Sequence, residues 1–159
     1  MYLIDGTESL DELLALSYGL EDANSRYYSM LSDRATTPSV RELFHMLSDL
    51  EGRHKNRIQK IYEELTEAGR QLVDFKSRVV AKTLENGKTP DQMFLESPEF
   101  FDDQNAAVEF SMALETDSLD LYLKMARKVQ TGKASSLFFT IAEDEKKHLE
   151  KLGELYREM

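Results

Sequence analysis

Two Glu-x-x-His motifs are the residues of this sequence best suited to chemistry. Glu51 and His54 form the first motif, and Glu145 and His148 form the second. Residues three apart on a helix share one face, with Cβ atoms about 5–6 Å apart, so such a carboxylate and imidazole can bind a common centre. A single motif of this kind is usually a surface pair. Two copies in one chain are much more specific for a metal site.

The two motifs belong to an internal repeat with an offset of 94 residues. Glu21 and Glu115, which align at this offset, each precede a motif by 30 residues, and Tyr28 aligns with Tyr122. The repeat runs without gaps from about residue 10 to the end of the chain. Helical sequences often match by chance at Leu and Glu, but two of the three histidines match here together with their glutamates. We therefore predict two similar helical hairpins related by an approximate twofold axis.

Each of the four aligned glutamates interrupts the apolar face of a helix. Apolar residues recur at spacings of three and four, as at Phe44, Leu47 and Ile58 around Glu51, which is typical of a buried helix face. A buried carboxylate must be protonated, paired with Lys or Arg, or bound to metal. Since no Lys or Arg lies on these faces near the glutamates, an ion pair is the weaker explanation. Two divalent cations would balance four carboxylates, and each would gain one imidazole. The predicted metal ligands are Glu21, Glu51, His54, Glu115, Glu145 and His148.

Three further side chains are weaker candidates. Tyr28 and Tyr122, two turns after Glu21 and Glu115, can donate hydrogen bonds to metal-bound carboxylates, or they can be ordinary core tyrosines. His45 has no glutamate at the matching position and aligns with Phe139. We expect it to be a packed or half-exposed histidine rather than a ligand.

The composition excludes several classes of protein. The chain of 159 residues has no Cys, which excludes disulfide scaffolds, thiolate zinc sites and iron–sulfur clusters. A net charge of −10 disfavours nucleic acid and anionic membranes as partners, although solvated helix faces explain most of it. No run of 18 apolar residues and no basic leader occurs, so we expect neither a membrane span nor a secretory signal, and a cytoplasmic location.

Only seven Gly and three Pro residues interrupt the sequence, which favours long helices. We expect one all-α domain over residues 1–159, with helices near 7–33, 37–69, 103–130 and 133–157. Short joins pair these helices into antiparallel hairpins at about 7–69 and 103–159. Residues 70–102 carry Asn86-Gly87, Thr89-Pro90 and Ser97-Pro98 and cannot form one helix. We interpret this segment, with a helical first half, as a crossover along a four-helix bundle.

At these residues the sequence resembles the ferritin-like di-iron carboxylate superfamily, most closely its rubrerythrin-like branch. The resemblance implies a ferritin-like four-helix bundle that binds two iron ions, although manganese and zinc accept the same ligand types. It implies that Glu21 and Glu115 are terminal ligands, one per metal, and that Glu51 and Glu145 bridge the metals. His54 and His148 would complete the two ligand sets.

Departures from the family pattern narrow the expectation. Rubrerythrins usually have a second glutamate three residues after the ligand of the third helix, where this chain has Ser118. The cysteine-rich rubredoxin domain is missing, so electrons would come from an external donor. Gly52 replaces the methionine that holds haem in bacterioferritin, so no haem is expected. The chain ends eleven residues after His148, without the fifth helix of ferritin cages, so we expect a homodimer or monomer.

The resulting expectation is a non-haem di-iron oxidoreductase that reduces peroxide or dioxygen. The alternative is an iron-binding or ferroxidase protein that oxidises Fe(II) without turning over another substrate. A third interpretation is a scaffold that keeps its buried carboxylates by protonating them.

Overall fold

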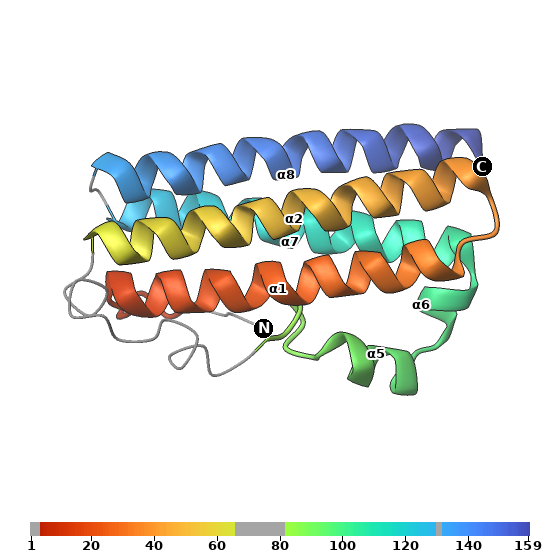
Figure 1. Ribbon diagram of the computed structural model, residues 1–159, viewed down its shortest axis with the longest axis horizontal. Helices are drawn as coiled ribbons and strands as arrows, with labels where there is room; N and C mark the ends of the chain where they lie inside the picture. The colour runs from red at the N-terminus through yellow and green to blue at the C-terminus, as the bar shows by residue number, and fades with distance from the viewer. Residues whose placement is uncertain (1–3, 66–81, 130–131) are drawn as a thin grey trace.

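Four long helices form the body of the molecule (Figure 1). The computed structural model describes residues 4–65, 82–129 and 132–159, and these residues contain helices but no strand. The long helices are α1 (Leu10–Arg34), α2 (Pro38–Leu65), α7 (Gln104–Val129) and α8 (Gly132–Glu158). They confirm the predicted all-α, ferritin-like bundle.

Helix starts agree with the capping residues visible in the sequence. The Ser9 hydroxyl accepts a hydrogen bond from the backbone N–H of Glu12, which fixes the start of α1. At the start of α7, the Asp103 carboxylate accepts backbone hydrogen bonds from Asn105 and Ala106. Pro38 opens α2 in the first turn, where its missing N–H costs nothing.

The helices pair as α1 with α2 and α7 with α8, as the two predicted antiparallel hairpins require. Helix α7 starts at the same end of the bundle as α2, next to the turn that joins α1 to α2 (Figure 1). The connection between the hairpins must therefore travel the length of the bundle. Residues 70–81 of its expected helical first half lie outside the described part of the chain, and residues 82–86 form no helix.

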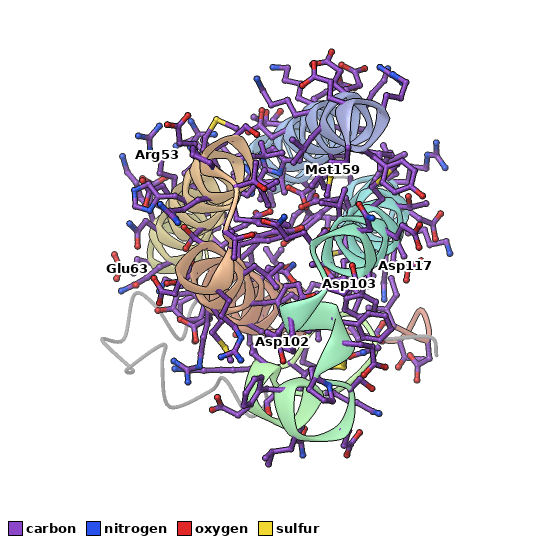
Figure 2. The ribbon with its side chains drawn as sticks, turned by 90° about the vertical axis from the view of Figure 1, so that its right-hand side faces the viewer. Arg53, Glu63, Asp102, Asp103, Asp117 and Met159 are labelled. Atoms are coloured by element: carbon purple, nitrogen blue, oxygen red, sulfur yellow. The ribbon has the colours of Figure 1, made fainter. Side chains whose placement is uncertain are left out.

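The second half of the crossover carries two short helices, α5 (Pro90–Glu96) and α6 (Glu99–Asp102). A capping box between Thr89 and Gln92 starts α5. Salt bridges join the crossover to α1, from Arg26 to Asp91 and from Arg34 to Asp102. The crossover helices lie below the bundle, where α5 and α6 contact α1 and α6 also packs against α7 (Figures 1 and 2).

The apolar core is divided into two clusters. One cluster includes Tyr27, Phe44 and Phe101, and the other includes Leu13, Ile58 and Phe138. Figure 2 looks along the bundle and shows side chains filling the space between the four helices, with Arg53 and Asp117 pointing outward. Between the two clusters lies a layer of buried polar residues, which includes every predicted metal ligand.

Among the helices that the structure describes, none combines the length and the apolar character needed to cross a membrane.

Candidate metal centre

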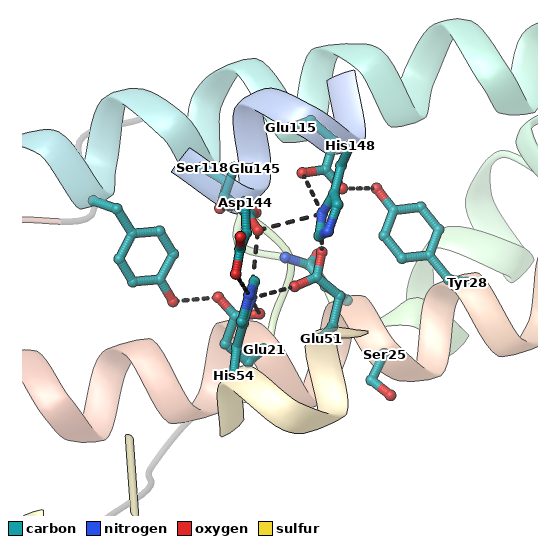
Figure 3. Close-up of polar contacts among 12 residues, drawn as sticks. Glu21, Ser25, Tyr28, Glu51, His54, Glu115, Ser118, Asp144, Glu145 and His148 are labelled. Atoms are coloured by element: carbon teal, nitrogen blue, oxygen red, sulfur yellow. Dashed lines mark hydrogen bonds and ion pairs between the residues drawn. The ribbon is translucent and has the colours of Figure 1, made fainter. Parts of the chain in front are cut away.

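All six predicted ligands meet in the middle of the bundle, and each is at most 2% exposed. One comes from α1, two from α2, one from α7 and two from α8 (Figure 3). We refer to them together as the Glu–His cluster: Glu21, Glu51, His54, Glu115, Glu145 and His148. The seven-residue apolar pattern of each helix turns these side chains inward, which is why they face one another.

The carboxylates of Glu51 and Glu145 lie between the two histidines. One oxygen of Glu51, Oε2, is 2.9 Å from His54 Nδ1, and its other oxygen, Oε1, is 3.3 Å from His148 Nδ1. Glu145 Oε1 is 3.4 Å from each of the same two nitrogens. Both glutamates are therefore within reach of both halves of the cluster, as a bridging role needs.

Glu21 and Glu115 occupy the outer positions. Glu21 Oε2 is 3.5 Å from His54 Nδ1, and Glu115 Oε2 is 3.5 Å from His148 Nδ1. Potential ligand atoms accordingly form two groups that share Glu51: one with Glu21 and His54, the other with Glu115, Glu145 and His148. Within each group these atoms lie within 4.8 Å of one another, so each group could hold a metal ion.

Both predicted tyrosines donate hydrogen bonds to outer glutamates, each across the bundle to the other hairpin. Tyr28 of α1 donates to Glu115 Oε1 of α7 at 2.5 Å. Tyr122 of α7 donates to Glu21 Oε1 of α1. Burial and the neighbouring carboxylates hold the pKa of each hydroxyl well above its usual value, so both tyrosines keep the proton that they donate.

Without metal, several groups of the Glu–His cluster hold protons more tightly than they would in water. Burial, followed by the charge of Glu51, raises the pKa of Glu21 well above its usual value, and burial and three neighbouring glutamates do the same for Glu145. Burial also opposes the charging of the histidines, but surrounding carboxylates raise the pKa of His54 to about 12 and that of His148 to about 10. Protons thus supply the positive charge that four crowded carboxylates require.

Several polar atoms of the cluster remain without hydrogen bonds. They include one oxygen of each glutamate, and also His148 Nδ1, which lies near three carboxylate oxygens without hydrogen-bond geometry to any of them. Buried polar atoms are rarely left unpaired. Oxygen and imidazole nitrogen atoms that converge in this way fit divalent iron, manganese or zinc.

Sequence reasoning missed two polar neighbours of the cluster. Asp144 Oδ2 lies 3.0 Å from His54 Nε2, on the side of the ring away from the glutamates. Glu85, from the crossover, is 5% exposed and accepts a hydrogen bond from Asn24 at 2.8 Å. Asp144 directly precedes a predicted ligand, which was a usable signal, whereas Glu85 lies outside the repeat and no spacing pointed to it.

The structure also places His45 and Ser118, two residues that the sequence analysis singled out. The third histidine, His45, is exposed on α2 with 72% of its side chain accessible and lies 3.6 Å from Asp49. It is more exposed than expected and takes no part in the Glu–His cluster. Ser118, in place of a further glutamate, donates a hydrogen bond to Glu145 Oε2 at 2.8 Å.

The comparison with known families agrees with the geometry. The sequence model of the Rubrerythrin family matches residues 12–156, nearly the whole chain. Searches of curated proteins and of solved structures found no significant match. The family match covers nearly all of the four long helices and every residue of the Glu–His cluster, and it confirms the resemblance seen in the sequence. The chain therefore belongs to the rubrerythrin family of the ferritin-like di-iron superfamily.

Proposed function

We propose that this protein is a non-haem di-iron oxidoreductase that reduces peroxide or dioxygen with electrons from an external donor. The observation that carries the proposal is the position of Glu51 and Glu145, each within 3.4 Å of both histidines. Two cations held on either side of these carboxylates would share them, and a shared pair of redox metals can deliver two electrons to one substrate.

In this proposal the six residues of the Glu–His cluster hold two iron ions. Glu21 with His54 would hold one ion and Glu115 with His148 the other, and Glu51 and Glu145, which lie close to both histidines, would be shared by the two ions. The bound iron pair would supply the two electrons that a peroxide or dioxygen molecule accepts. The apolar clusters on both sides exclude bulk water, and the hydroxyls of Tyr28 and Tyr122 orient the outer carboxylates.

Metal loading under anaerobic conditions tests the proposal directly. We expect protein purified without metal to bind two Fe(II) ions per chain, measured by titration and by metal analysis after gel filtration. Addition of peroxide should then oxidise both ions, followed by the absorbance of Fe(III). A protein that binds one metal or none contradicts the proposal.

A matched pair of substitutions on α2 controls this experiment. Glu51→Gln removes a central carboxylate and should abolish binding of at least one ion, whereas Glu42→Gln, on the exposed face of the same helix, should bind two. Sustained peroxide consumption with a supplied reductase identifies an oxidoreductase. Oxidation that stops after one round identifies the alternative, an iron-binding ferroxidase. If the protein is instead a scaffold with protonated carboxylates, the wild type binds no metal, and Glu51→Gln raises the stability of the metal-free protein without abolishing any activity.

A further inference from the structure

Glu85 is a buried carboxyl group next to the Glu–His cluster but not part of it. Its Oε1 accepts a hydrogen bond from Asn24 Nδ2 at 2.8 Å, and its Oε2 is buried with no hydrogen-bond partner. No Lys, Arg or His among the described residues forms an ion pair with it. Such a group is stable in a protein interior only when it keeps its proton.

The internal repeat shows where the Glu85–Asn24 pair sits relative to the metal centre. Asn24 aligns with Ser118, which donates to the central carboxylate Glu145. The repeat partner of Glu145 is Glu51, so the symmetry would lead one to expect Asn24 to donate to Glu51, but the Asn24 amide donates to Glu85 instead. Since the crossover occurs only once, Glu85 adds a carboxyl group to one side of the centre and has no counterpart on the other.

The charges around Glu85 favour its neutral form. Burial is the main cause of a pKa raised to about 8; the Asn24 amide and the backbone N–H of Glu85 act in the opposite direction, and the negative charges of Glu115 and Glu51 add to the rise. These groups face Glu85 from α1, α2 and α7. Because Asn24 donates to Oε1, the carbonyl oxygen of the acid, its proton resides on Oε2, the oxygen without a partner.

We infer that Glu85 is a proton donor for reduction of the oxidant at the metal centre, with Asn24 as the residue that positions it. The inference rests on the proposed function. Peroxide reduction follows H₂O₂ + 2 e⁻ + 2 H⁺ → 2 H₂O: the O–O bond breaks, the iron pair supplies two electrons, and each oxygen leaves as water. Glu85 Oε2 gives one of the two protons and solvent gives the other, after which solvent reprotonates Glu85.

Infrared spectroscopy of the zinc-loaded protein tests the protonation of Glu85 without any turnover. Zinc ties up the carboxylates of the cluster, so a carbonyl band of an un-ionised carboxyl group near neutral pH should come from Glu85. We expect this band in the wild type and in Glu99→Gln, an exposed control on the same crossover. It should be missing in Glu85→Gln, which is similar in shape and still accepts the Asn24 hydrogen bond.

The same variants are then loaded with Fe(II) and mixed once with peroxide. Glu85→Gln should bind two iron ions as the wild type does, but oxidise them about 100-fold more slowly, the typical contribution of a positioned acid. Asn24→Ser, which copies the repeat partner, keeps Glu85 and gives a second test if Glu85→Gln folds poorly. In that variant the infrared band should remain but move to higher frequency, because the carbonyl loses a hydrogen bond.

Three results would overturn the inference: no carboxyl band in the wild type, oxidation of Glu85→Gln at the wild-type rate, or loss of a metal ion from Glu85→Gln, which would make Glu85 a ligand. An unchanged band in Asn24→Ser would remove the positioning role of Asn24. If wild-type protein binds iron but does not react with peroxide, the proposed function fails first, and the inference fails with it. Wild-type reactivity combined with a normal rate in Glu85→Gln overturns the inference alone.

Discussion

Asp144 makes the two histidines of the Glu–His cluster chemically different. Its carboxylate lies 3.0 Å from His54 Nε2, and this contact and the charge of His54 lower the pKa of Asp144. The position that corresponds to Asp144 for His148 is Leu50, which has no carboxylate to offer. A carboxylate behind a ligating imidazole fixes the ring and strengthens it as a ligand. The metal position next to His54 should therefore be the tighter one.

Replacing Asp144 with Asn tests this difference. We expect affinity for one of the two metal ions to fall about 10- to 100-fold, the usual effect of losing such a partner, while the second ion binds as before. Stepwise Zn(II) titration with a competing chelator measures both affinities. Asp120→Asn, which removes an exposed ion-pair partner of Lys124, is the control. An equal loss at both positions would show that Asp144 acts on the whole cluster instead.

At the residue scale, the sequence was sufficient to identify the candidate site residues that occur in both copies of the repeat. The repeat has one offset, and at this offset the six members of the Glu–His cluster align in pairs, as do Tyr28 and Tyr122. These residues can therefore be identified from the sequence alone. Asp144 and Glu85 have no repeat partner of their own type. Their roles depend on contacts between segments far apart in the chain, which spacing along one helix does not reveal.

At the scale of the helices, a pair of reciprocal hydrogen bonds joins α1 to α2. The Ser25 hydroxyl donates to the backbone carbonyl of Ser48, and the Ser48 hydroxyl donates to the backbone carbonyl of Ser25. The corresponding positions in the second hairpin are Leu119 and Ala142, which cannot form these bonds. The two hairpins thus share one sequence pattern but are held together differently.

The double variant Ser25→Ala/Ser48→Ala should lower the free energy of unfolding of metal-free protein by about 1–3 kcal/mol, for two hydrogen bonds lost. Urea denaturation followed by circular dichroism measures the change. Thr116→Ala removes a hydroxyl that bonds only within its own helix, to the carbonyl of Met112, and should leave stability nearly unchanged. Equal stability of the double variant and the wild type would mean that these bonds merely replace bonds to water.

Helix bounds were predictable to within a few residues because the caps and prolines mark them. Core positions are harder to predict than helix bounds: Phe138 and Tyr62 are fully buried, whereas the adjacent apolar residues Leu137 and Ile61 are only partly buried. A stripe read at spacings of three and four allows such one-residue errors. The short helix α5 was missed because Thr89-Pro90 signals a turn and a helix start equally well.

For the whole molecule, the buried ionisable groups should make stability depend on pH. The metal-free protein should become less stable as pH rises, whereas the stabilisation by bound metal should increase. Glu21 and Glu145 have raised pKa values, so the folded state holds protons that the unfolded state loses above about pH 4.5. His54 and His148, with pKa values of about 12 and about 10, do the same above pH 6.5. In this range the folded state binds more protons, so the free energy of unfolding falls as pH rises.

We therefore expect the metal-free protein to lose stability steadily between pH 5 and pH 9, by about 1.4 kcal/mol per pH unit for each extra proton held. Urea titrations at several pH values measure this loss. Metal ions displace the same protons, so stabilisation by Zn(II) should increase with pH. A metal-free protein whose stability is constant or rises over this range would show that the cluster is ionised and stabilised without protons or metal.

The crossed tyrosine contacts have a consequence for how such a molecule can arise. Tyr28 reaches the glutamate of the opposite hairpin, and Tyr122 returns the same contact in the reverse direction. This exchange is the pattern of an isologous interface, in which one surface is complementary to its own copy. Two identical copies of a single hairpin would thus bring together every group that the centre needs. When both hairpins lie in one chain, each half can change alone, and Asp144 and the crossover carboxyl Glu85 are groups that occur on one side only.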